Sequence, residues 1–208
     1  MTADPGPIGP DASIRQTPKA RATRARVLDS ARRLFVERGY DAVSITDIAA
    51  VGDMTKGAVY GHFRSKGHLL IEVIRNEMAI VDEVEDPPPD APMRASVSAL
   101  VSPRRTDLRL LEVDAAAAAR HDQTVADGLR ELYRERRGWM EVALSAAADP
   151  ESVAWFIEVL ARGIGTLEAT GQPLLDVDTL ESVLRAVLSG PLGVQRPDGP
   201  AHHERSPE

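Results

Sequence analysis

Residues 44–63 constrain the fold of this 208-residue chain most strongly, because their pattern is typical of two short helices joined by a tight turn. Ser44 suits the N-cap of the first helix, and Asp47 follows three residues later, where its carboxylate can reach back to the Ser44 amide. Gly52 and Asp53 then interrupt the helical periodicity, and both residue types tolerate positive φ. The segment therefore predicts a helix-turn-helix.

The second helix of this segment has one apolar side and one polar side. Thr55 can cap it, and only Ala58, Val59 and Phe63 are apolar enough to hold it against the rest of the chain. Its other side carries threonine, lysine, tyrosine and histidine. A short helix that is anchored on one side and polar on the other suits the major groove of double-stranded DNA.

The charge distribution agrees with a DNA-binding first third of the chain. The formal net charge is −7, which by itself disfavours binding to phosphate. Between Arg15 and Arg75, however, 12 lysines and arginines stand against 6 acidic residues, so the rest of the chain carries the acidic excess. The basic residues thus gather around the predicted reading helix, and the acidic remainder is expected to keep DNA at one end of the molecule.

The composition excludes several classes of site. The chain contains no cysteine, which excludes disulfides, thiol catalysis and cysteine-ligated zinc. It also lacks paired histidines at metal spacing outside the final tail, a glycine-rich phosphate loop and a plausible nucleophile–base pair. No apolar run reaches the length of a membrane span, and Met1–Pro10 has no secretory pattern. We therefore expect a cytoplasmic protein with no catalytic residues, cofactor or metal, and no membrane partner.

Helical periodicity and helix-ending residues predict an all-α fold of about nine helices. Pro-rich and polar segments at 1–17 and 191–208 are expected to be disordered tails. Residues 18–64 form the expected three-helix DNA-binding domain, with its first helix beginning near Thr23. Residues 65–190 form the expected helical ligand-binding and dimerisation domain, which begins with a long helix capped by Ser65.

Large apolar side chains in the second domain are candidates for a ligand pocket. Glu112 lies in an alanine-rich helix, where it either orients a ligand or forms a salt bridge with Arg105 or Arg109. The long helix that follows His121 carries a stripe of large residues, which either lines a cavity or packs as ordinary core. The candidate pocket residues are Met78, Met93, Leu111, Glu112, Tyr133, Trp139, Met140 and Trp155.

The last two helices carry more apolar surface than a small core needs, which makes this helix pair a candidate homodimer surface. Asp149-Pro150 is a typical start for the first of them, and Asp176 or Asp178 can cap the second. The candidate interface residues are Phe156, Leu160, Ile164, Leu167, Leu180, Leu184 and Val187.

Apolar, glycine and polar residues recur at fixed spacing through the first third of the chain, as Thr23-x-x-x-Val27-Leu28-x-x-Ala31-x-x-Leu34-Phe35-x-x-x-Gly39-Tyr40, then Ser44-Ile45-x-x-Ile48-Ala49, then Thr55-Lys56-Gly57-Ala58-Val59-Tyr60-x-His62-Phe63-x-Ser65-Lys66-x-x-Leu69-Leu70. These residues, from Thr23 to Leu70, cover about a quarter of the chain and resemble the TetR family of bacterial transcriptional regulators. Many matched positions at fixed spacing make the resemblance specific. The chain departs from the family at Asp53, where glycine is usual, and at Gly61, where a larger residue is usual. We expect the turn at Asp53 to survive with slight strain.

The resemblance implies which residues contact DNA. Phosphate contacts are expected from Thr46, Tyr60, His62 and Lys66, and base-edge contacts from Thr55, Lys56, Gly57 and Ala58. Arg21, Thr23 and Ser44 complete the candidate DNA-binding set. For Phe63 we expect packing against the first helix instead of DNA contact.

The resemblance also implies a mechanism, in which a homodimeric repressor leaves its operator DNA when a small, mostly apolar effector binds. Two alternatives within DNA binding are a ligand-independent regulator and an activator. A third alternative is a helical small-molecule-binding protein or enzyme whose basic first third is incidental. A steep loss of DNA binding with increasing salt distinguishes the regulators from this third class.

Overall fold

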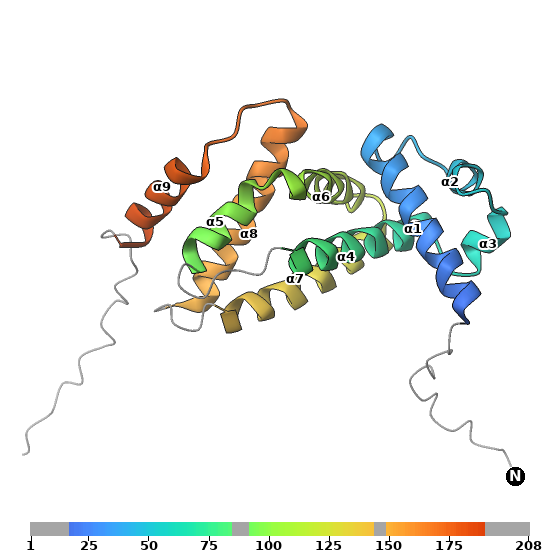
Figure 1. Ribbon diagram of the computed structural model, residues 1–208, viewed down its shortest axis with the longest axis horizontal. Helices are drawn as coiled ribbons and strands as arrows, with labels where there is room; N and C mark the ends of the chain where they lie inside the picture. The colour runs from blue at the N-terminus through green and yellow to red at the C-terminus, as the bar shows by residue number, and fades with distance from the viewer. Residues whose placement is uncertain (1–16, 85–91, 144–148, 190–208) are drawn as a thin grey trace, which may run out of the picture.

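The computed structural model describes residues 17–84, 92–143 and 149–189, and every regular element in these ranges is a helix (Figure 1). The all-α prediction is confirmed. The predicted tails lie outside the described residues, apart from Thr17. The described helices are α1 (Pro18–Arg38), α2 (Ile45–Val51), α3 (Lys56–Tyr60), α4 (Lys66–Val84), α5 (Pro92–Val101), the 3-10 turn η1 (Pro103–Arg105), α6 (Thr106–Ala118), α7 (Gln123–Ala143), α8 (Pro150–Ala169) and α9 (Val177–Ser189).

Helix α1 begins earlier than the sequence analysis expected. The Thr17 hydroxyl accepts a hydrogen bond from the Ala20 amide at 3.2 Å, and Pro18 occupies the first turn, where its missing N–H costs nothing. Thr23 therefore lies inside the helix, and its hydroxyl donates to the Lys19 carbonyl at 3.0 Å. Thr23 neither caps nor begins α1.

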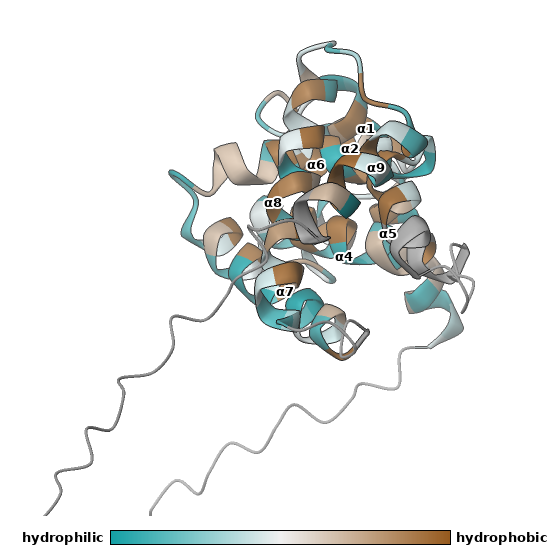
Figure 2. Ribbon diagram, turned by 90° about the vertical axis from the view of Figure 1, so that its left-hand side faces the viewer, coloured by the Kyte–Doolittle hydropathy of each residue, from teal (hydrophilic) through white to brown (hydrophobic). Residues whose placement is uncertain are grey.

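One apolar core joins the DNA-binding helices to the second part of the chain. The buried face of α1 packs with α2, α3 and α4, and the same core continues into α6 and α7 through Leu108, Leu111, Val125 and Leu129. Hydrophobic and hydrophilic residues alternate along the helices, as amphipathic packing requires (Figure 2). The apolar packing is thus continuous across the predicted boundary at residues 64 and 65, and the division into two domains stays a prediction.

A second, smaller core holds the C-terminal helices. It contains Val97 and Leu100 of α5, Ala161 and Ile164 of α8, and Leu180 and Leu184 of α9. Helix α9 packs chiefly on α5, while α8 packs on α6 and α7 (Figure 1). The long α4 extends from the DNA-binding helices toward this region and contacts both α6 and α7.

Gly165 lets α8 approach α6 closely. A Cβ atom at this position would lie 3.2 Å from the Arg109 carbonyl oxygen and 3.3 Å from the Val113 side chain. These distances are tighter than ordinary van der Waals contacts, so any larger residue would push the two helices apart. Gly163, two residues earlier, faces open space.

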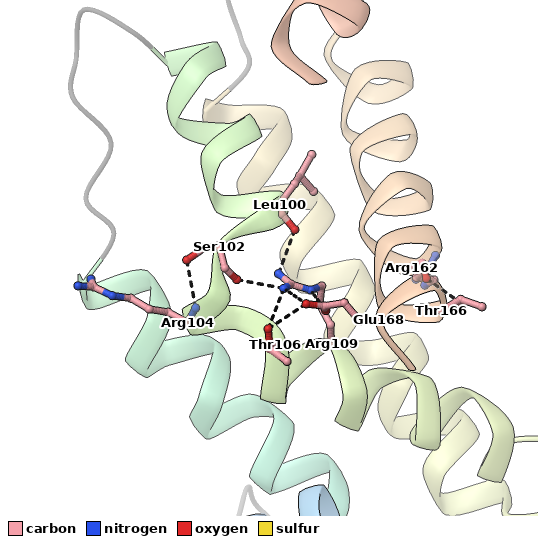
Figure 3. A network of polar contacts seen from close by, with 8 residues as sticks. All are labelled: Leu100, Ser102, Arg104, Thr106, Arg109, Arg162, Thr166 and Glu168. Carbon is pink, nitrogen blue, oxygen red and sulfur yellow. Dashed lines mark hydrogen bonds and ion pairs between the residues drawn. The ribbon is translucent and has the colours of Figure 1, made fainter. Parts of the chain in front are cut away.

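A buried arginine ties α5, α6 and α8 together (Figure 3). The Arg109 side chain is 4% exposed, and its guanidinium donates two hydrogen bonds to the Glu168 carboxylate, at 2.5 and 2.7 Å. It also donates to the carbonyls of Leu100 and Ser102, each at 3.0 Å, and the Thr106 hydroxyl donates to Glu168 at 2.9 Å. Arg109 holds the pKa of the Glu168 carboxyl below its usual value, because the charge-assisted hydrogen bonds favour the ionised form.

Ion pairs connect α1 with the helices around it. Arg24 pairs with Glu72 of α4. Arg32 pairs with the buried Glu77 of α4 at 2.8 Å and with Asp107 of α6 at 2.5 Å. One guanidinium of α1 thus bridges two helices of the second part of the chain.

Candidate nucleic-acid interface

The turn between α2 and α3 is built from the residues that the sequence pattern singled out. The Ser44 amide donates to the Asp47 carboxylate at 2.8 Å, and the Asp47 amide donates to the Ser44 hydroxyl at 3.2 Å, which completes the expected capping box. These hydrogen bonds lower the pKa of the Asp47 carboxyl. The turn then places Asp53 at φ +48°, as expected for a left-handed position occupied by aspartate.

Gly52 serves a different purpose from the one suggested by its position in the turn. Its φ is −81°, so it does not supply the left-handed residue. A Cβ atom there would lie 2.2 Å from the Met54 methyl group and 3.0 Å from the Ser30 hydroxyl of α1. The Met54 methyl group can move aside, but the Ser30 hydroxyl and the Ile48 carbonyl oxygen, at 3.3 Å, leave little room for a side chain, so glycine suits the close approach of the turn to α1.

Arg26 of α1 holds the turn in place, a role that sequence reasoning missed. Its guanidinium donates to the Gly52 carbonyl and, at 3.0 Å, to the Asp53 carbonyl. These carbonyls lie just after the C-terminal end of α2, where the helix dipole also favours a positive charge. The contact joins residues 26 positions apart, so a local sequence pattern cannot predict it.

Helix α3 is anchored as the sequence predicted. The Thr55 hydroxyl accepts from the Ala58 amide at 3.1 Å and so caps the helix. Val59 and Phe63 are 0% and 1% exposed, and the Arg24 guanidinium lies over the Phe63 ring. The expected packing role of Phe63 is confirmed. The outer side of α3 is free in this structure, with Thr55, Lys56 and Gly57 exposed and Tyr60 half exposed.

The other predicted DNA contacts surround this helix. Thr46 and Ser44 are exposed at the start of α2, and Ala58 and His62 are partly buried. Arg21 is exposed on the first turn of α1, whereas Thr23 is partly buried and bonded within the helix. These residues remain predicted DNA contacts.

Lys66 has partners inside the protein that the sequence analysis did not anticipate. Its ammonium donates to the carbonyls of Tyr40 and Val43, at 2.9 and 3.1 Å, and lies 4.0 Å from the centre of the Tyr40 ring. Only one N–H remains for any other acceptor. Lys66 therefore fastens the loop between α1 and α2, and its phosphate contact stays a prediction.

The structure corrects the candidate ligand pocket. Trp139 and Trp155 are 63% and 56% exposed, so neither lines the interior of the chain. Leu111 is fully buried in the core shared with α1 and α4, and Met78 packs against that core. Met140 is buried on α7, and the side chain of Met93 lies outside the described residues. A periodic stripe indicates only that a helix has a buried side, and it cannot tell which large residues lie at its edge.

Glu112 and Tyr133 form a buried polar pair between α6 and α7. Burial raises the pKa of the Glu112 carboxyl, although Arg136 lies 3.2 Å away and opposes the effect. Of the two arginines expected to pair with Glu112, Arg109 pairs with Glu168 instead, and the salt bridge of Glu112 is with Arg136 of α7. Burial likewise raises the pKa of Tyr133 to about 12, and its hydroxyl has no hydrogen-bond partner among the described residues. The Arg162 guanidinium lies over the Tyr133 ring at 4.0 Å.

Replacing Glu112 by glutamine is expected to change how stability depends on pH. A carboxyl whose pKa is raised by folding stabilises the protein below its unfolded pKa of about 4.3, and this contribution is lost as pH rises through the folded value. The stability of Glu112→Gln relative to the wild type should therefore improve from pH 4 upward. Urea unfolding at several pH values measures this, and a difference that is constant across the series would contradict it.

The predicted dimer residues divide into buried and exposed groups. Ile164, Leu180 and Leu184 are buried inside the chain, so they cannot serve as a free surface. Phe156 and Leu160 are partly buried against the same core, and the side chain of Val187 lies outside the described residues. Leu167 is 43% exposed and, with Trp155 and Val159, follows the open side of α8. Periodicity identified the apolar helices correctly but could not foresee that α9 would pack on α5.

Two structural absences hold for the described part of the chain. No helix there is both long and apolar enough to cross a membrane. No group of three or more histidine, aspartate or glutamate side chains in these ranges is arranged to hold a metal ion.

Comparisons with known proteins agree with this geometry. Residues 27–73 match the family described as "Bacterial regulatory proteins, tetR family". The Transposon Tn10 TetC protein of Escherichia coli is 42% identical over 62 residues, which cover 30% of this chain and 32% of the relative. The HTH-type transcriptional repressor KstR of Rhodococcus jostii is 32% identical over 112 residues, covering 48% of this chain and 53% of the relative. The matches thus span about a third to a half of these relatives.

The fold comparison extends over most of the described chain. A putative TetR-family transcriptional regulator from a Rhodococcus species has a TM-score of 0.66 at 16% identity, covering 81% of this chain and 97% of the other. At this identity the likeness concerns the fold alone. Residues 27–73 thus match the helix-turn-helix segment of the TetR family of bacterial regulatory proteins, and the chain shares its all-helical fold with a solved regulator of that family.

Proposed function

We propose that this protein is a DNA-binding transcriptional regulator that acts as a homodimeric repressor and releases its operator when a small, mostly apolar effector binds. The observation that carries the proposal is that α3 is buried on one side and exposed on the other. Val59 and Phe63 anchor the helix from below, whereas Thr55, Lys56 and Gly57 are exposed on its outer side. This arrangement supports insertion of the helix into a major groove.

Side-chain chemistry suggests a role for each exposed group. Lys56 can donate to the O6 and N7 atoms of guanine. The Thr55 hydroxyl already accepts the cap bond, so its methyl group is available for a thymine methyl. Thr46, Tyr60 and His62 are proposed to bind phosphates, and Arg21 adds a basic contact from the start of α1.

The exposed side of α8 is the proposed homodimer surface. Trp155, Val159 and Leu167 are 56%, 42% and 43% exposed, and they recur at helical spacing. Gly163 lies between them and faces open space, so a second copy of α8 can approach closely there. A two-fold dimer would present its two reading helices about 34 Å apart, one turn of DNA.

The proposed effector region lies among α4, α6 and α7. Met78 and Tyr133 are partly buried there beside the buried Leu111, and the Tyr133 hydroxyl lacks a hydrogen-bond partner among the described residues. Glu112 adds a buried carboxyl whose pKa is raised. These properties favour an effector with an apolar body and a hydrogen-bonding group. Helix α4 contacts this region and also the DNA-binding helices, so it is the proposed link between the two.

The proposal is tested by measuring binding to duplex DNA taken from beside the protein's own gene, at a series of salt concentrations. The logarithm of the association constant should fall linearly with the logarithm of the salt concentration, because each neutralised phosphate releases counterions. A shuffled duplex of the same length is the control. A protein that binds neither duplex, or binds both equally at every salt concentration, would refute specific regulation. A promoter–reporter assay then distinguishes repression from activation.

A further inference from the structure

An open groove of about 620 Å³ runs between α1 and α4, away from the proposed effector region. Its volume falls within the range of small-molecule sites, about 300–1,000 Å³. One wall comes from one side of α1 and the other from α4, where the two helices cross (Figure 1). The residues that line it are Arg21, Arg24, Ala25, Leu28, Asp29, Arg32, Val73, Asn76, Glu77 and Ile80.

The groove has an apolar surface that reaches solvent. Leu28 and Val73 are buried beneath it, and Ala25 is exposed along its edge. Ile80 is 49% exposed, so about half of its side chain is in contact with water at the edge of the groove. A ligand with an apolar body would remove this surface from water.

The charges in the groove leave one cation uncompensated among the described residues. Arg24 pairs with Glu72, and Arg32 pairs with both Glu77 and Asp107. The remaining acid, Asp29, faces Arg33 at 3.4 Å. Within the described ranges, the Arg21 guanidinium has no ion-pair partner, and the exposed Asn76 amide lines the same groove. Both are hydrogen-bond donors for an anion.

We propose that this groove is a second ligand site, which binds a small amphipathic anion such as a medium-chain carboxylate. The apolar body lies against Leu28, Val73 and Ile80. The carboxylate accepts hydrogen bonds from Arg21 and Asn76. This site does not depend on the proposed DNA binding, although a ligand there would occupy Arg21 and would brace α1 against α4.

The probes are decanoate and decyltrimethylammonium, which share an apolar chain and carry opposite charges. Isothermal titration calorimetry of the full chain, with each probe below its micelle concentration, should give one decanoate bound per chain and weaker binding of the cation. Arg21→Gln should weaken decanoate binding about tenfold, as expected for loss of a charge-assisted hydrogen bond. Arg104→Gln is the matched control, because Arg104 is an exposed arginine on η1 outside the groove.

A second variant tests the place of binding independently of charge. Ala25→Trp puts an indole into the groove from an exposed position, so it should abolish decanoate binding while circular dichroism and the melting temperature show an intact fold. If decanoate does not bind the wild type, the proposal fails. It also fails if the cation binds as tightly as decanoate, or if Arg21→Gln and Ala25→Trp both leave decanoate binding unchanged.

Discussion

Replacing Arg109 by alanine is expected to lower the free energy of unfolding by about 3–5 kcal/mol, the usual cost of removing one partner from a buried ion pair. The side chain is 4% exposed, and its guanidinium donates hydrogen bonds to Glu168, to the Leu100 carbonyl of α5 and to the Ser102 carbonyl just after α5. Its loss leaves the Glu168 carboxylate with one hydrogen bond from this network, donated by the Thr106 hydroxyl. Urea or guanidinium unfolding followed by circular dichroism measures the change.

Two companion variants make this result specific. Arg130→Ala removes an exposed pair with Asp127 and should cost at most about 1 kcal/mol. The double change Arg109→Met with Glu168→Leu removes both charges, so it should recover much of the stability lost in the single variant.

The stabilisation from the Arg109–Glu168 pair should also depend on pH. Because Arg109 lowers the pKa of the Glu168 carboxyl in the folded protein, this stabilisation is present at neutral pH and is lost as pH falls through the lowered pKa. The deficit of Arg109→Ala should therefore shrink in acid, and a deficit that grows there would contradict this account.

Replacing Lys56 is expected to weaken DNA binding without changing stability, whereas replacing Lys66 is expected mainly to lower stability. Lys56→Ala should weaken operator binding about 5- to 150-fold, because one good base contact contributes about 1–3 kcal/mol, and it should leave the melting temperature almost unchanged. Lys56 is exposed on α3, so its removal disturbs no packing.

Lys66→Met should instead lower the free energy of unfolding by about 1–3 kcal/mol, since the carbonyls of Tyr40 and Val43 lose their common donor. Operator binding per folded molecule should change less than it does in Lys56→Ala. Fluorescence anisotropy with a labelled duplex and thermal unfolding separate the two effects. Equal losses of DNA affinity in both variants, with unchanged stability in Lys66→Met, would favour the predicted phosphate contact of Lys66 over its structural role.

The local features of the DNA-binding helices could be predicted because short-range chemistry decides them. Ser44 and Asp47 cap each other within one turn, Thr55 caps its own helix, and Asp53 adopts a positive φ that few other residue types tolerate. The buried side of α1 also followed from its periodicity, as the positions of Val27 and Phe35 illustrate.

What the sequence could not predict is which apolar or charged side chain meets which distant partner. Leu180 and Leu184 form a convincing stripe, yet only the packing of α9 on α5 decides that the stripe is internal. Trp139 and Trp155 lie on amphipathic helices, and their exposure depends on where neighbouring helices end. Arg26, Arg109 and Lys66 bond to backbone carbonyls from other helices or loops, and carbonyls have no sequence signature.

The hydrogen bonds from Arg26 to the turn determine which parts of the molecule can move separately. Because α1 holds the carbonyls of Gly52 and Asp53, α1 and the reading helix behave as one rigid body. Helix α1 also packs on α4 in the shared apolar core and pairs with it through Arg24 and Glu72. Helix α4 has 19 residues and is about 28 Å long, so it acts as a lever arm on that body. A small tilt of α4 would thus move α1, α2 and α3 together without deforming the surface that is proposed to read DNA.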